Sequence, residues 1–210
     1  MSRSAEVLRI LERYLVEVVE RHALCPWARA AREQGELAVG IVWGTPALEA
    51  WVAEAERLLA LPATRVAMVI APEIAVSREA LRALRDVVAA RIPSAGVADF
   101  HPAAALDLAT PARLVPFLRR SPDPLLQLVP LALLDAVRAG PPPPDLAQQA
   151  TMLAGRAEAP RPDIATRIAA ANHATVAAAH AAITAALDDI AADRRAAYAR
   201  VGISAAPGAR

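Results

Sequence analysis

The sequence predicts an α/β or α+β fold, with a small sheet of about three to four strands packed against helices and a long C-terminal helix. Three short apolar runs, residues 37–43, 65–71 and 96–101, are punctuated by glycine or proline and indicate strands. Stretches of helical periodicity alternate with them. Alanine, leucine and valine must fill the core, because the chain is 56% apolar but only 3% aromatic. Such a composition favours helix.

The helices follow from apolar residues that recur three and four positions apart, which is the spacing of one buried helix face. The stretches expected to be helical are about 4–22, 26–34, 47–61, 77–91, 125–138 and 163–200. Ser4 and Ser77 are the expected N-caps of the first and fourth helices, and Gly35 ends the second. Pro130 should kink the fifth helix or mark its true first turn.

Prolines divide the chain into three regions. Residues 1–139 form the expected α/β core, and residues 140–162 form a stiff proline-rich linker with a short helix around 145–155. Residues 163–210 form the long alanine-rich helix and a frayed tail that begins at Gly202. The thin apolar stripe of this helix must pack on the core or on a second copy of the chain, which would make a homodimer.

Charge, cysteine count and hydropathy exclude several classes of protein. The 23 basic residues, all arginine, and the 22 acidic residues nearly cancel, which argues against a nucleic-acid or membrane partner. A single cysteine excludes an intrachain disulfide and a Cys-x-x-Cys redox or zinc site. The N-terminus lacks a secretion signal pattern, and the longest apolar stretch, residues 125–137, is too short to span a bilayer. We therefore expect a cytoplasmic protein.

Cys25, the only cysteine, lies where one helical pattern stops and another starts. Pro26 cannot continue the first helix but suits the first position of a second one, so Cys25 is the expected N-cap of that helix. The positive end of a helix dipole stabilises a thiolate, which is the reactive form of cysteine. The alternative is a small buried apolar residue at a helix corner.

Two further segments carry candidate site residues. His101 ends a strand, where α/β folds place ligands, and could transfer protons or merely cap a loop. Arg119, Arg120 and Ser121 offer two guanidinium groups and a hydroxyl beside a proline, which suits recognition of an anion. No metal site is expected, because no carboxylate completes a ligand set with His173 and His180.

Three motifs, in this order, resemble a bacterial family known as domain of unknown function 1415. They are Leu24-Cys25-Pro26-Trp27-Ala28, Phe100-His101-Pro102, and Arg120-Ser121-Pro122 followed by Pro124. The resemblance covers about residues 7–137, and the segment that starts at Asn172 is similar to one near the end of that family. Arg119 replaces the usual asparagine, so the chain resembles a divergent member. The resemblance implies no reaction, but it implies that these motifs act together.

The leading hypothesis is a small-molecule enzyme with a thiolate site. Cys25 would be the nucleophile or redox centre, His101 the proton-transfer group, and Arg120 with Ser121 and Arg119 the binding site for a small anionic substrate. In the alternative, Cys25 is the thiolate ligand of a haem or metal, and His101 is a distal or second axial group. A third hypothesis is a non-enzymatic interaction protein that docks through its long helix. The first predicts that Cys25, His101 and Arg120 line the same cavity.

Overall fold

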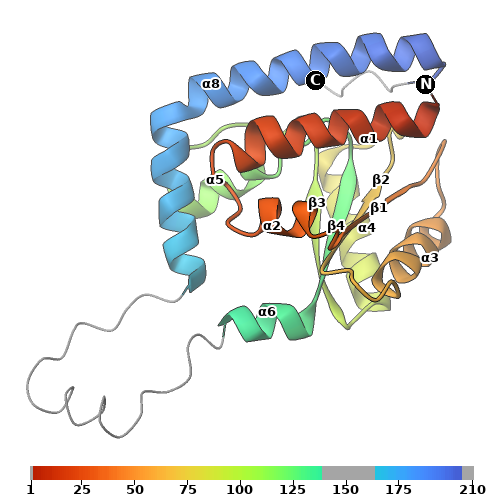
Figure 1. Cartoon of the computed structure of the whole chain (residues 1–210), viewed down its shortest axis with the longest axis horizontal. Coiled ribbons are helices and arrows are strands. Elements are labelled where there is room, and N and C mark those ends of the chain that lie inside the picture. The colour runs from red at the N-terminus through yellow and green to blue at the C-terminus, as the bar shows by residue number, and fades with distance from the viewer. Residues whose placement is uncertain (1, 139–163, 205–210) are drawn as a thin grey trace, which may run out of the picture.

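A computed structural model describes residues 2–138 and 164–204 and confirms the α/β class. Its centre is a four-stranded mixed sheet of order β1-β2-β4-β3 (Figure 1). The strands are β1 (Leu37–Ile41), β2 (Val66–Ile70), β3 (Ala95–Phe100) and β4 (Leu125–Pro130). β1 and β2 are parallel, whereas β4 lies antiparallel to both of its neighbours, β2 and β3.

Helices cover both faces of this sheet. α3 (Leu48–Leu59) and α4 (Arg78–Arg91) pack on one face, where Trp51, Leu81 and Val69 are buried together. The opposite face is covered by α1 (Arg3–Arg13), by the π-helix η1 (Tyr14–Glu20) and by α8 (Ile164–Val201). The shorter helices are α2 (Ala28–Glu33), α5 (Pro111–Leu118) and α6 (Leu131–Arg138).

The three strands predicted from the sequence are confirmed, but the helix predicted over residues 125–138 is wrong in its first half. Residues 125–130 form β4, and the chain becomes helical only at Leu131. Leu125 faces one core and Leu126 the other, so the segment is apolar on both sides. A strand buried on both faces has no alternating pattern, and its leucines resemble a helix in sequence.

The N-terminal helical stretch differs from its prediction in two details. Ser2, rather than Ser4, is the N-cap, and its side chain accepts a hydrogen bond from the Ala5 N–H at 3.2 Å. From Tyr14 the helix widens to π geometry, a form that is rare outside short insertions. The π-helix ends at Glu20, and a turn follows in which Ala23 has a φ of 51° before the segment that contains Cys25.

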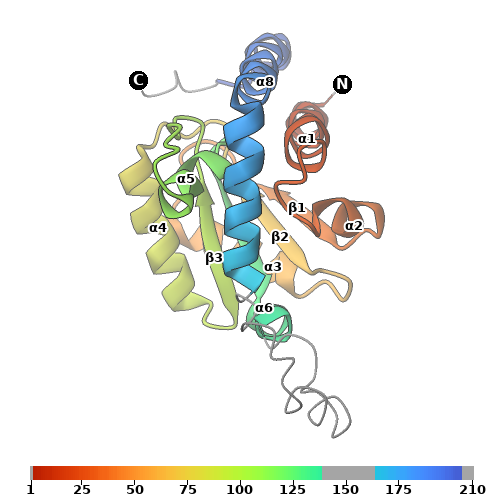
Figure 2. The same ribbon diagram turned by 90° about the vertical axis from the view of Figure 1, so that its left-hand side faces the viewer.

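The apolar stripe of α8 packs on the core of its own chain, which is one of the two arrangements that the sequence left open. Val176, Ile183, Leu187, Ile190 and Tyr198 are all buried in the same core as α1. The helix bends, so that its first part runs past α6 and α5 while its last part lies alongside α1 (Figure 2). By length and hydropathy alone α8 could cross a membrane, so the cytoplasmic location stays a prediction.

The end of α8 is fixed rather than frayed as far as Ser204. Gly202 has a φ of 67°, and the Ile203 N–H donates to the Tyr198 carbonyl at 2.9 Å. This is a Schellman motif, which satisfies the last carbonyls of a helix. Ile203 is buried against the core. The predicted linker over residues 140–162 and the tail after 204 lie outside the described residues.

Candidate functional site

A pocket of about 360 Å³ lies where α4, the end of β3 and α5 meet. Its charged lining consists of Arg78, Arg82, Arg85, Asp99 and Arg119, and His101 also borders it. Part of its wall comes from α5 and is apolar. Four guanidinium groups therefore face a single carboxylate, a composition that the overall charge balance of the chain does not reveal.

α4 places three of these arginines on one side of a helix. Positions 78, 82 and 85 are four and three residues apart, so their side chains leave the helix in nearly the same direction. Ser77 fixes the start of the helix, because its hydroxyl accepts a hydrogen bond from the Ala80 N–H at 3.1 Å. Leu81 and Val88 bury the adjacent side against the sheet. The arginine row is thus held by a rigid, capped element.

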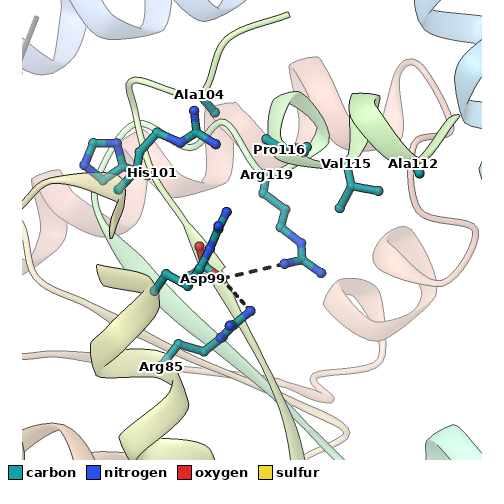
Figure 3. A pocket seen from close by; sticks show the side chains of 10 residues that line it. Arg85, Asp99, His101, Ala104, Ala112, Val115, Pro116 and Arg119 are labelled. Atoms are coloured by element: carbon teal, nitrogen blue, oxygen red, sulfur yellow. Dashed lines mark hydrogen bonds and ion pairs between the residues drawn. The ribbon is translucent and has the colours of Figure 1, made fainter. Parts of the chain in front are cut away.

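Asp99 connects the two sides of the pocket (Figure 3). Its Oδ1 atom lies 3.2 Å from Nη1 of Arg85 on α4 and 3.7 Å from Nη1 of Arg119, which follows α5. The Asp99 side chain is only 13% exposed. Burial lowers the pKa of the Arg119 guanidinium, Asp99 raises it, and the nearby Arg85 and Arg82 lower it further. The cations of the pocket therefore repel one another, and one carboxylate offsets this only in part.

His101 is buried and uses both of its ring nitrogens. The Ala103 N–H donates to Nδ1 at 3.0 Å, and Nε2 lies 2.8 Å from the Val76 carbonyl oxygen. A carbonyl only accepts, so Nε2 carries the proton and the ring is held as one neutral tautomer. The His101 N–H also donates to the Arg119 carbonyl at 3.0 Å. His101 therefore ties the loop before α4 and the segment after α5 to the end of β3.

Arg120 and Ser121 lie outside the pocket. Arg120 donates from Nε to the Pro102 carbonyl and from Nη2 to Asp188 on α8, both at 3.2 Å. Ser121 is buried and donates to the Asp123 carbonyl at 2.5 Å. Both residues therefore hold loops and helices together, and their predicted contact with a substrate gains no support from the geometry.

Cys25 is half-buried and is not the N-cap of α2. Pro26 and Trp27 first form a turn, in which the Ala28 N–H donates to the Cys25 carbonyl at 3.3 Å, and the N-cap is Trp27. The thiol packs against the core that contains Tyr14. Burial, with Cys25 nearby, raises the pKa of the Tyr14 phenol. The thiol thus lacks the helix-end environment predicted for it.

The structure brings His101 together with Arg119 but does not place Cys25 in the same pocket. The Cys25 segment is instead linked to α8, because Asn172 donates from Nδ2 to the Leu24 carbonyl at 3.0 Å. Two of the motif segments that resemble the bacterial family therefore meet, away from the arginine pocket. The prediction that Cys25, His101 and Arg120 line one cavity is wrong for the pocket described here.

The site residues predicted from the sequence do not include Arg78, Arg82, Arg85 and Asp99. Two signals for them were present. A helix with a serine cap carries arginines at positions 1, 5 and 8, and Asp99 stands two residues before His101, so that both face the same side of an extended strand. The abundance of arginine in the whole chain concealed the first signal.

No group of three or more His, Cys, Asp or Glu side chains within residues 2–138 and 164–204 could hold a metal ion. His173 is engaged instead, with Nε2 at 2.9 Å from the Leu108 carbonyl oxygen. Comparison of the chain with protein-family models, with curated proteins and with solved structures finds no match. The resemblance to the bacterial family therefore stays a prediction, and the pocket is the feature that points to a function.

Proposed function

We propose that this protein binds a small anionic ligand in the arginine pocket between α4, β3 and α5. The observation that carries the proposal is the convergence of four arginines from two helical segments on a pocket with one aspartate. Guanidinium groups present paired N–H donors that match the oxygens of carboxylates and phosphates. The unbalanced charge would attract an anion and hold it by several charge-assisted hydrogen bonds.

Partial burial strengthens this proposal. Arg119 is 35% exposed and Arg85 is 23% exposed, so both side chains are largely removed from water before any ligand arrives. Charge interactions are stronger where the surroundings are less polar than water. The α4 helix and the bonds of His101 hold the pocket in place, which lowers the cost of ordering side chains on binding.

The thiolate enzyme predicted from the sequence stays a prediction, because the pocket involves neither Cys25 nor Arg120. The haem or metal alternative also stays a prediction, and both His101 ring nitrogens have hydrogen-bond partners within the protein. Docking of a protein partner through α8 also stays a prediction. The anion pocket shares His101 and Arg119 with the first hypothesis but needs neither a reactive thiol nor a haem.

Isothermal titration calorimetry with phosphate, sulfate and succinate in a low-salt buffer tests the proposal. Arg119→Ala should weaken binding about tenfold or more, because a hydrogen bond to a charged group contributes about 1.5–3 kcal/mol. Arg91→Ala is the matched control, since Arg91 lies on α4 but outside the pocket. Cys25→Ala should leave the affinity unchanged.

Two results would overturn the proposal. One is that none of the three anions binds at millimolar concentration. The other is that binding persists unchanged in both Arg82→Ala and Arg119→Ala, which would place the anion elsewhere on the protein. Raising the salt concentration should weaken true binding, because added ions screen the guanidinium charges.

A further inference from the structure

We infer that the ligand of the arginine pocket is a small phosphate monoester whose carbon skeleton carries a hydroxyl group near the phosphate. This inference rests on the proposed anion binding and specifies its chemical class. Three features of the pocket support it: the clustering of its cations, the position of its one carboxylate, and the size and character of its remaining wall.

The cations are clustered closely enough to favour one group with two negative charges. Arg85 and Arg119 lie 3.2 and 3.7 Å from the same Asp99 oxygen, and Arg82 lines the same pocket. Arg85 already donates to Asp86 Oδ1, from Nε at 3.0 Å and from Nη2 at 2.6 Å. Arg82 and Arg119 are therefore more available to bind the anion. A phosphate monoester carries close to two charges and three acceptor oxygens on one atom. A dicarboxylate separates its charges and matches such a cluster less well.

Asp99 determines what stands beside the phosphate. Its Oδ1 contacts Arg85 and Arg119, and among the described residues this carboxylate is the one acidic group that lines the pocket. A carboxylate repels the phosphate itself but accepts a hydrogen bond from a neighbouring hydroxyl group. An ammonium group would also suit Asp99, but the four surrounding arginines oppose a further cation. A hydroxyl group donates a hydrogen bond to Asp99 without adding a positive charge.

The remaining wall and the volume limit the skeleton. Ala112, Val115 and Pro116 from α5 present short apolar side chains to the pocket (Figure 3). A volume of about 360 Å³ is near the lower end of the range of about 300–1,000 Å³ for small-molecule pockets. A short carbon chain with hydroxyl groups fits this space, with its carbon atoms against α5 and its hydroxyl group toward Asp99.

Calorimetry with four probes tests the inference on the full chain. The probes are glycerol 3-phosphate, methyl phosphate, methyl sulfate and succinate. Methyl sulfate has the shape of methyl phosphate with one charge fewer, and methyl phosphate lacks the hydroxyl groups of glycerol 3-phosphate. We expect glycerol 3-phosphate to bind about tenfold more tightly than methyl phosphate, and methyl phosphate about tenfold more tightly than methyl sulfate. Asp99→Asn should reduce the first ratio and leave the second.

The outcomes separate this inference from the proposed function. If succinate binds as tightly as glycerol 3-phosphate, or methyl sulfate as tightly as methyl phosphate, and Arg119→Ala abolishes that binding, the ligand class is wrong and the anion pocket stands. If glycerol 3-phosphate and methyl phosphate bind equally, the role of Asp99 is wrong. If none of the probes binds, both proposals fail. The four-probe comparison in the unmodified protein remains decisive even if Asp99→Asn does not fold.

Discussion

His101 acts at the scale of single residues by holding three chain segments in place around the pocket. Its ring bonds to Val76 before α4 and to Ala103 after β3, and its backbone N–H bonds to Arg119. Each of these segments leads directly to a lining residue of the pocket. The imidazole is therefore a positioning group, and its 6% exposure is that of a structural side chain.

Replacing His101 with alanine should lower the free energy of unfolding by about 1–3 kcal/mol, because the Val76 carbonyl and the Ala103 N–H would lose their partners. Urea denaturation followed by circular dichroism measures this loss. His180→Ala is the control: His180 is exposed on α8 and should change stability by less than about 0.5 kcal/mol. An equal loss in both variants would show that the His101 bonds contribute nothing specific.

Single residues also show how far the sequence could predict the site. His101 and Arg119 were predicted and do share the pocket. Arg120 follows Arg119 directly but bonds to Pro102 and to α8, because the chain leaves α5 in an irregular conformation that sends neighbouring side chains different ways. Cys25 was predicted to be an N-cap because Pro26 follows it. Local rules for proline and helix ends do not predict the turn through Pro26 and Trp27, which moves the N-cap of α2 to Trp27.

Elements whose edges and faces are both buried were the hardest to predict from sequence. Residues 125–130 have leucine-rich helical character, yet they lie between β2 and β3 and become the central antiparallel strand. Tertiary pairing overrides local propensity in such a place. α4 was predicted with its cap and its end, because Ser77 and the apolar spacing are local signals. α5 was missed, since two prolines obscure a helix that begins at one of them.

α1 and α8 are joined by an ion-pair cluster that should respond to acid. Asp193 accepts from Arg9 at 2.6 and 2.9 Å and from Arg13 at 2.7 Å. These guanidinium groups hold the pKa of the Asp193 carboxyl well below its usual range. A carboxyl whose pKa is lowered by folding stabilises the protein above its unfolded pKa of about 3.9, and this contribution is lost as the pH falls further.

Asp193→Asn should therefore destabilise the protein by about 1 kcal/mol at pH 7, a modest value because the cluster is partly exposed. The difference from the unmodified protein should shrink as the pH falls below about 4. Denaturation at pH 7 and at pH 3 measures both values. Glu56→Gln, an exposed carboxyl on α3, should show no such change. A difference that is the same at both values of pH would mean that packing, not charge, is responsible.

The whole molecule shows why composition conceals the site. The formal net charge is +1, yet four arginines gather at one pocket, whereas others such as Arg13, Arg32 and Arg57 are paired with carboxylates. The total numbers of basic and acidic residues average over all of these regions. Such totals can argue against an extended nucleic-acid surface, but they do not reveal a small anion site. Burial, which composition does predict, is organised as two cores on opposite faces of one sheet.

The two cores should unfold together, because β2 and β4 contribute alternate residues to each of them. Ile190 on α8 is fully buried in one core, and Trp51 on α3 is buried in the other. Ile190→Ala should cost about 2–5 kcal/mol, and Trp51 fluorescence should report this loss although it lies across the sheet. Trp27→Phe and Trp43→Phe make Trp51 the sole reporter, and Arg195→Ala is an exposed control on α8. If the circular-dichroism transition of the helices shifts in Ile190→Ala while the Trp51 fluorescence transition does not, the α1–α8 side unfolds alone.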